Sequence, residues 1–298
     1  MDLTAFAESV GASDPVTVSG AGTRGGPMPD ARCVAAPSGI VEFEPAEMTV
    51  RCGAGTTVNE LLSTLAEAGQ SLALPAGGTV GGALACGRSD VYRLGRGPVR
   101  DTLLQARYVG AQGQVVKAGG QTVKNVSGFD LCRLLVGSFG TLGFLGEVIL
   151  RTRPRPAVSR WFATTDADPF ALLGSLYRPA SLLWDGETTW VCLEGHAEDV
   201  EAQAGSVSGA REVHGPPTLP VGSRRSVAPT SLRSLTGTFV AEIGVGVVHH
   251  GEPTPTGTAV STEVRLLHGQ IKGLFDPTGR LNPGLDVLDV LGTTGGMS

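Results

Sequence analysis

Closely spaced cysteines are absent from this chain. Its five cysteines are dispersed, and no two of them stand at a CxxC spacing: Cys33, Cys52, Cys86, Cys132 and Cys192. Zinc ribbons and iron–sulfur clusters require closely spaced thiolates, so we expect neither in this chain and predict no metal site. An odd, scattered set also argues against a disulfide framework and indicates a reducing compartment.

Charge and long apolar runs are scarce as well. Charged residues make up 17% of the 298-residue chain and the net charge is −5, which argues against a nucleic-acid-binding surface. The longest uncharged apolar stretch, residues 134–146, has 13 residues and several glycines, so it is too short to span a bilayer. The first ten residues carry acids where a signal peptide carries basic residues. We therefore expect a cytoplasmic protein without a transmembrane segment.

Glycine, by contrast, is abundant. It accounts for 44 of the 298 residues, about twice its average share, and shows no collagen-like period. Much of it lies in three loops: SGAGTRGG at 19–26, PAGGTVGGALACG at 75–87 and GGQTVKNVSGFDLCRLLVGSFGTLG at 119–143. Glycine permits positive φ and close approach of the backbone to another group. Three such loops indicate main chain laid against a large flat ligand.

Hydrophobic patterning predicts a mixture of strands and helices. Thr57 stands three residues before Glu60, a capping-box spacing, and the helix that it begins should end at Gly69. Further helices are expected near 169–176 and 264–274, and strands at 16–18, 49–52, 71–74, 103–109, 115–118, 144–152 and 189–193. The proline-studded segment 153–156 is the predicted domain boundary, which divides the chain into residues 1–156, 157–264 and 265–298.

Two familiar nucleotide-binding motifs do not fit the first glycine loop. A Rossmann fingerprint requires a helix directly after the loop, but residues 27–30 read PMPD and cannot begin one cleanly. A P-loop requires a Gly-Lys-Ser or Gly-Lys-Thr ending, which the sequence lacks. The remaining interpretation is an anion-binding nest, in which successive backbone N–H groups face a pyrophosphate.

Six motifs in order give the chain a family resemblance. They are GAGT at 20–23, PAGGTVGG at 75–82, RD at 100–101, GGQTVKNVSGFDL at 119–131, GSFGTLG at 137–143 and FDPTGRLNPG at 275–284. Together they resemble the FAD-binding oxidases of the vanillyl-alcohol oxidase (PCMH-type) family, and within it the E-type subunits of bacterial glycolate oxidase. The resemblance implies an α+β fold: a PCMH-type FAD-binding domain of two α/β subdomains over 1–156, a reduced α+β cap over 157–264, and a C-terminal segment, 265–298, that returns to the FAD domain.

The resemblance also implies a set of cofactor contacts. Gly20, Gly22 and Thr23 would line the pyrophosphate, and Asp101 would fix the loop under the flavin. The remaining implied contacts approach the ring, the ribityl chain and the adenosine: Gly77, Gly78, Gly81, Gly82, Lys124, Asn125, Ser127, Gly128, Gly140, Thr141, Gly143, Asn282 and Gly284. Relatives with covalent FAD carry a His after the first loop or a Cys near the second. Here those places hold Arg24 and LPAGG, so we expect FAD to be bound non-covalently.

A catalytic base is harder to find in the sequence. Of the five histidines, only His249 and His250 follow an apolar run that could return a strand toward the flavin, and a structural role for this pair is the competing interpretation. Arg24 and Arg100 are candidate carboxylate anchors, with helix-capping or phosphate-facing roles equally open.

Three functions therefore stay open. One is an FAD-binding subunit of a glycolate (2-hydroxy acid) dehydrogenase complex, with a larger catalytic flavoprotein and an iron–sulfur subunit as partners. The others are a self-sufficient FAD oxidoreductase that acts on another small alcohol or hydroxy acid, and a degenerate assembly scaffold. The intact glycine loops argue against the scaffold.

Overall fold

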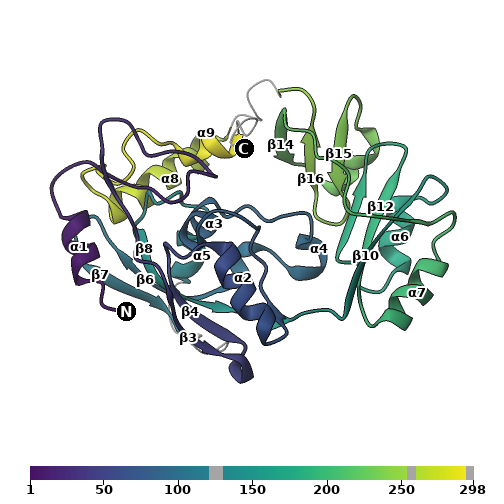
Figure 1. Cartoon of the computed structure of the whole chain (residues 1–298). Helices are drawn as coiled ribbons and strands as arrows, with labels where there is room; N and C mark the ends of the chain where they lie inside the picture. The colour runs from purple at the N-terminus through teal and green to yellow at the C-terminus, as the bar shows by residue number, and fades with distance from the viewer. Residues whose placement is uncertain (121–129, 254–259, 293–298) are drawn as a thin grey trace.

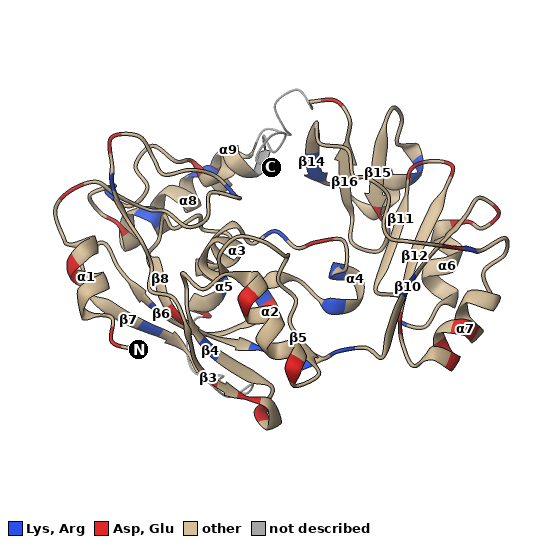
Figure 2. Ribbon diagram, viewed as in Figure 1, with Lys and Arg blue, Asp and Glu red and all other residues tan. Residues whose placement is uncertain are grey.

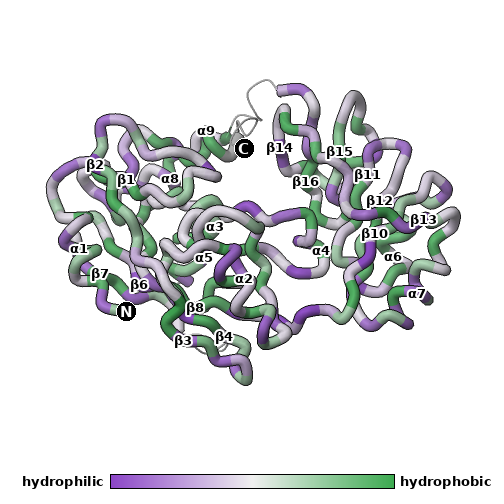
Figure 3. The backbone as a smooth tube through the Cα atoms, in the orientation of Figure 1, coloured by the Kyte–Doolittle hydropathy of each residue, from purple (hydrophilic) through white to green (hydrophobic). Residues whose placement is uncertain are grey.

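The structure, a computed structural model, describes residues 1–120, 130–253 and 260–292, and it contains two sheet-based halves that lie side by side (Figure 1). The fold is α+β, as predicted. Hydrophobic backbone segments follow the strands of both sheets, whereas hydrophilic segments lie mostly in the connections (Figure 3). Within these ranges no helix is both long and apolar enough to cross a membrane.

The first half is built on a five-stranded antiparallel sheet. Its strand order is β3 (Ile40–Glu44), β4 (Thr49–Gly53), β8 (Phe144–Arg151), β6 (Leu103–Val109) and β7 (Val115–Gly119). The central strand β8 is buried at every residue except Arg151. Helices α2 (Val58–Glu67), α3 (Val80–Cys86) and α5 (Leu131–Leu135) pack their buried leucines against this sheet in one continuous core.

A smaller element carries the first glycine loop. Strands β1 (Val16–Val18) and β2 (Arg32–Val34) pair in parallel, and residues 19–31 connect them without a helix, as the sequence indicated. Helix α1 (Thr4–Val10) packs beside them, and its buried Phe6 and Val10 share a core cluster with Val16. The loop therefore leaves a strand whose residues are anchored in the core.

The C-terminal segment returns to this element. After α8 (Thr262–Phe275), the Val16 N–H donates to the Arg280 carbonyl at 2.9 Å, and the Asn282 N–H donates to the Val16 carbonyl at 2.9 Å. The Arg280 side chain, 3% exposed, is buried between the two chain ends. Helix α9 (Val287–Gly292) follows and lies beside α8 (Figure 1). Residues far apart in the sequence thus form one wall of the first half.

The second half is a seven-stranded antiparallel sheet. Its order is β13 (Arg211–Val213), β10 (Val158–Thr164), β12 (Thr189–Gly195), β11 (Ser181–Trp184), β15 (Phe239–Glu242), β16 (Val247–His250) and β14 (Ser223–Ser226). Helices α6 (Pro169–Ser175) and α7 (Ala197–Gly205) cover one face with a core of their own. The chain passes from one sheet to the other just after the short pair β5 (Gln70–Ser71) and β9 (Arg153–Pro154).

Helix α4 (Arg93–Arg96) joins the two halves. Its Gly95 N–H donates to the Ala180 carbonyl at 3.1 Å, and a Cβ on Gly95 would come within 2.6 Å of the Ala180 Cα. Arg96 forms an ion pair with Glu194 of β12 and stacks over the Tyr92 ring, 3.9 Å from its centroid. Only glycine lets α4 approach β11 this closely, so the contact fixes one half against the other.

Candidate functional site

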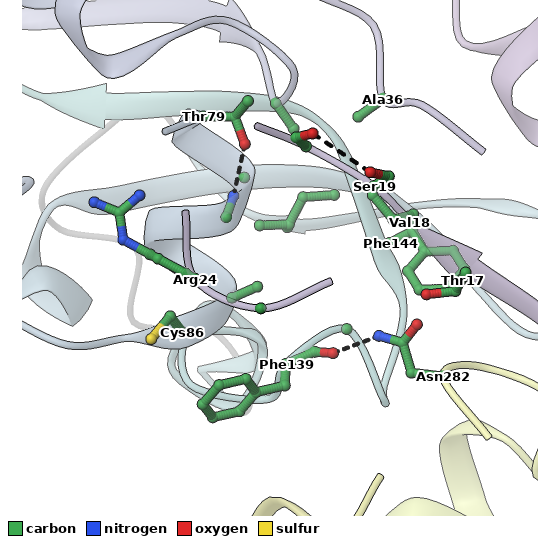
Figure 4. Close-up of a pocket in the computed structure, with 18 of the residues that line it drawn as sticks. Thr17, Val18, Ser19, Arg24, Ala36, Thr79, Cys86, Phe139, Phe144 and Asn282 are labelled. Atoms are coloured by element: carbon green, nitrogen blue, oxygen red, sulfur yellow. Dashed lines mark hydrogen bonds between the residues drawn. The ribbon is translucent and has the colours of Figure 1, made fainter. Parts of the chain in front are cut away.

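A cavity of about 150 Å³ opens where the glycine loops converge (Figure 4). Its wall combines residues of the first loop, the start of α3, the 138–145 segment and the C-terminal turn. Eight residues predicted to contact a cofactor lie together on this wall: Gly20, Gly22, Thr23, Gly81, Gly82, Gly140, Gly143 and Asn282. Their contact with a ligand stays a prediction, but the structure brings them to one place.

The first loop packs against the N-terminus of α3. The Thr79 hydroxyl caps this helix by accepting the Gly82 N–H at 3.2 Å. A Cβ on Gly20 would lie 2.7 Å from the same hydroxyl oxygen, so glycine is required for the two segments to meet. Gly22 has φ +71°, and a Cβ there would meet no protein atom within 4 Å. Gly22 thus takes a backbone conformation that favours glycine beside open cavity space.

Arg24 ties the first two glycine loops together. Its guanidinium donates to the carbonyls of Gly77 at 2.9 Å, Pro75 at 3.1 Å and Ala76 at 3.2 Å. A Cβ on Gly78 would lie 2.3 Å from Arg24 Nη1. Gly77 and Gly78, which we expected near the ring and ribityl chain, are not on the cavity wall: the Gly77 carbonyl accepts a hydrogen bond from this arginine, and Gly78 leaves room for it. The three carbonyl contacts favour a loop-fixing role for Arg24 over a carboxylate anchor.

The C-terminal turn supplies an unpaired acceptor. Asn282, 9% exposed, donates from Nδ2 to the Phe139 carbonyl at 2.6 Å (Figure 4). Its Oδ1 is buried and has no hydrogen-bond partner in the described chain. Buried polar atoms are rarely left without a partner, so this oxygen is suited to a donor on a bound molecule. A Cβ on Gly140 would crowd Asn282 Nδ2 at 2.8 Å, which explains that glycine.

A second, larger cavity of about 750 Å³ adjoins the first. The two share Cys86, Ser138, Asn282 and Leu285 on their walls. The second cavity extends between the segment after α3, the helix α8 and Arg224 of β14, so it reaches the junction of the two halves. Thr141 and Gly284 lie on this wall rather than on the first.

Several predicted site residues lie elsewhere. Asp101 is on neither wall, and its carboxylate is within 3.9 Å of Arg100 and 3.8 Å of Arg133, which favours a local structural role. Lys124, Asn125, Ser127 and Gly128 lie outside the described residues. No group of three or more His, Cys, Asp or Glu side chains in the described ranges could hold a metal ion.

The histidine pair also lies away from both walls. His249 is buried in the second sheet, where its Nε2 is 2.9 Å from Glu242 Oε1. His250 accepts a hydrogen bond from Arg225 Nε at 3.0 Å, and burial together with that guanidinium lowers the pKa of His250. This arrangement favours the structural interpretation of the pair.

Sequence reasoning missed two residues with reactive side chains. Cys86 lies on both walls, and His268 of α8 lies on the second. It is the one histidine of the described chain that reaches either cavity. Thr79 followed by VGG is a capping signal that could have revealed α3, and with it the position of Cys86 at the helix end.

Comparison with known proteins defines the class of this site. Residues 11–119 match the family described as FAD binding domain, so the chain contains an FAD-binding domain and its cofactor is FAD. A solved structure of alkyldihydroxyacetonephosphate synthase superposes on 91% of this chain and 72% of its own with a TM-score of 0.65. Sequence identity to it is 14%, so this likeness concerns the fold alone.

Curated relatives narrow the resemblance. The chain is 34% identical over 204 residues to glycolate oxidase subunit GlcE of Escherichia coli K12, covering 62% of this chain and 55% of that protein. It is also 36% identical over 151 residues to a D-lactate dehydrogenase of Archaeoglobus fulgidus, covering 48% of this chain and 34% of that protein. The chain thus spans about half of the first relative and a third of the second.

Proposed function

We propose that this chain binds one FAD non-covalently across the two adjoining cavities and serves as the FAD-binding subunit of a complex that oxidises a small 2-hydroxy acid such as glycolate. The observation that carries the proposal is the convergence of three glycine segments and the unpaired Asn282 Oδ1 on one cavity. The similarity to glycolate oxidase subunit GlcE and to D-lactate dehydrogenases supports the substrate class.

The residues present fit the cofactor. The first cavity, about 150 Å³, is too small for a dinucleotide, but the adjoining 750 Å³ provides the remaining room. Apart from Arg24, the loop 19–26 brings backbone without large side chains to the wall, as an anion-binding nest for the pyrophosphate requires. Arg24 would hold that loop in place, and Asn282 Oδ1 would accept a hydrogen bond from the bound molecule. When bound, FAD supplies the hydride acceptor for the oxidation.

Dependence on partner subunits is the second part of the proposal. His249 and Glu242 contact each other inside the second sheet rather than in a cavity, so the histidine pair offers no base beside the flavin. A larger catalytic flavoprotein and an iron–sulfur subunit would supply the missing base and the onward electron path. We further propose residues 1–156 as the FAD domain, 157–264 as the cap, 265–298 as the returning segment, and a cytoplasmic location.

Two glycines provide a matched test of the cofactor site. Gly22 and Gly69 have φ values of +71° and +66°, and at both a Cβ would meet open space. Only Gly22 lies on the cavity wall. Gly22→Ala and Gly69→Ala should each lose about 1 kcal/mol of stability from backbone strain. Fluorescence titration with FAD should show at least tenfold weaker binding for Gly22→Ala alone; equal affinities would remove the first loop from the site.

The mode of attachment has its own test. Acid precipitation of the flavin-loaded protein should leave a colourless pellet and a yellow supernatant. If the pellet stayed yellow in the native protein but not in Cys86→Ser, FAD would instead be attached through a thioether to Cys86. Cys86 is the one cysteine of the described chain that lies on the cavity walls.

Activity separates the subunit from the self-sufficient enzyme. Dye-linked oxidation of glycolate and D-lactate by the purified chain should be negligible beside that of a complex co-expressed with its partner subunits. Equal turnover by the single chain would favour the self-sufficient oxidoreductase. In that case His268→Gln should abolish turnover and His250→Gln should not, because only His268 lies on the second cavity's wall.

A further inference from the structure

The wall of the second cavity carries a strong excess of positive charge. Seven lysine and arginine side chains lie on it but only one carboxylate, Asp286, although the chain as a whole has a net charge of −5. Figure 2 shows blue segments on β14, on α4 and between α3 and α4, all bordering the junction of the two halves. This concentration of charge requires a physical explanation.

Five of the seven basic groups have carboxylate partners. The pairs are Arg100 with Asp101, Arg133 with Asp130, Arg265 with Asp286, Lys272 with Asp276 and, at 3.8 Å, Arg224 with Glu242. The other two are Arg88 after α3 and Arg93 of α4, which line the cavity together with Arg224 of β14. Arg88, Arg93 and Arg224 come from three separate segments that line one cavity. Burial lowers the pKa of Arg224; Glu242 opposes this effect, and the charges of Arg88 and Arg93 add to it.

Of these three arginines, only Arg224 has an ion-pair partner in the described chain. Arg224 Nη2 lies 3.8 Å from Glu242 Oε1, the same oxygen that contacts His249. In the described chain, Arg88 and Arg93 form no ion pair, and Arg88 Nη2 is buried without a hydrogen-bond partner. Arginine does not deprotonate in proteins, so the cluster cannot relieve its repulsion by losing protons. In the described chain the charges of Arg88 and Arg93 thus have no ion-pair partner, and a bound anion would supply one.

We propose that the second cavity takes a 2-hydroxy acid with two anionic groups, held by Arg88, Arg93 and Arg224, in preference to a monocarboxylate. The inference rests on the proposed function, since it specifies the substrate class of the same site. A dianion supplies an ion-pair partner for both Arg88 and Arg93, whereas a monoanion supplies a partner for only one of them. The phosphates of FAD are not the expected occupant, because none of these three arginines lies on the first cavity's wall beside the glycine loop.

The experiment uses the full FAD-loaded chain and isothermal titration at constant ionic strength. The probes are malate as a dicarboxylate, 3-sulfolactate as a carboxylate with a sulfonate, and glycolate as a monoanion. At least one of the dianions should bind ten or more times more tightly than glycolate. The dianion that binds more tightly shows which kind of second anionic group the cavity prefers. Arg88→Gln and Arg93→Gln should each weaken that dianion at least tenfold, with a smaller effect on glycolate and unchanged FAD content.

Arg151→Gln is the matched control. This residue is exposed at the end of β8, lies on neither cavity wall and removes the same charge. Equal affinities of the wild type for dianions and glycolate would overturn the inference while FAD binding still stood. If Arg151→Gln lost as much affinity for the dianion as Arg88→Gln and Arg93→Gln, the effect would come from the overall charge of the protein and not from the cavity, and the inference would fail. A parallel loss of FAD in Arg88→Gln and Arg93→Gln would assign the arginines to the cofactor phosphates instead.

Discussion

Arg280 offers the sharpest test of how the C-terminal segment is held. Its guanidinium donates to the carbonyls of Val10 at 2.6 Å, Ala111 at 2.9 Å, Gly11 at 3.1 Å and, from Nε, Asp14 at 2.9 Å. Arg280→Met keeps the unbranched stem but removes every donor. The Ala111 carbonyl is in a fully buried hydrogen bond and loses this partner, whereas the Val10 carbonyl keeps a second donor, Arg32 Nη2, at 2.9 Å.

The expected loss follows from these contacts. The buried Ala111 carbonyl left without a partner costs about 1–3 kcal/mol, and the two partly buried carbonyls of Gly11 and Asp14 cost less, so Arg280→Met should lose about 2–4 kcal/mol. Urea unfolding followed by circular dichroism measures this. FAD affinity should fall too, because the adjacent turn brings Asn282 to the cavity. Arg265→Met is the control: its half-exposed ion pairs should contribute under about 1 kcal/mol. A loss in Arg280→Met no larger than in this control would refute the reasoning.

Two further predictions concern thiols and acid. Cys33 is the exposed cysteine, while burial raises the pKa of Cys52 to about 12 and that of Cys192 to about 11. A thiol reagent at neutral pH should therefore react quickly with one cysteine in the folded protein and with all five in denaturant. Burial alone would raise the pKa of Asp276, but hydrogen bonds from Lys272 and backbone N–H groups lower it. Its stabilisation is therefore complete above the unfolded pKa and is lost as pH falls through the folded one. Asp276→Asn should be about 2 kcal/mol less stable at pH 7, with a gap that narrows below about pH 4; a pH-independent gap would contradict this.

The first half of the fold could be predicted because its signals are local. Helix α2 begins as expected at Thr57, whose hydroxyl accepts the Glu60 N–H at 3.2 Å, and Gly69 follows its end at positive φ. Strands β6 and β7 form the expected hairpin around residues 110–113. The strand expected at 71–74 was wrong: only β5, Gln70–Ser71, forms there. Helix α3 was hidden by its glycines, which have low helix propensity.

The second half resisted prediction for a different reason. Strand β15 is buried at all four residues and β11 at three of four, so neither shows the alternation that identifies a strand. Edge strand β14 reads SRRS, which has no hydrophobic residue to mark it as a strand. Its pairing with β16 depends on contacts between residues 223–226 and 247–250, which no local pattern records.

In the site, sequence and structure differ over what each glycine is for. Gly22 faces open cavity space, as a cofactor contact would, whereas Gly78 makes room for Arg24 and Gly143 for the Tyr108 ring, 2.4 Å from its added Cβ. Glycine thus serves two roles in this site: it lets the backbone approach a ligand, and it leaves room for neighbouring side chains. A sequence motif cannot separate the two roles, because the atom that a Cβ would strike belongs to a residue distant in the chain.

The contribution of the second half to the cavity follows from Glu242. Its Oε1 contacts His249 at 2.9 Å and lies 3.8 Å from Arg224, while its Oε2 is buried without a partner in the described residues. Strands β15 and β16 thereby hold a carboxylate beside the arginine that reaches the second cavity. On this geometry the second half presents a cation, Arg224, to the cavity, while His249 contacts Glu242 inside the sheet. This arrangement is consistent with the proposal that the substrate anion is held here and that its proton is removed by a group from a partner subunit.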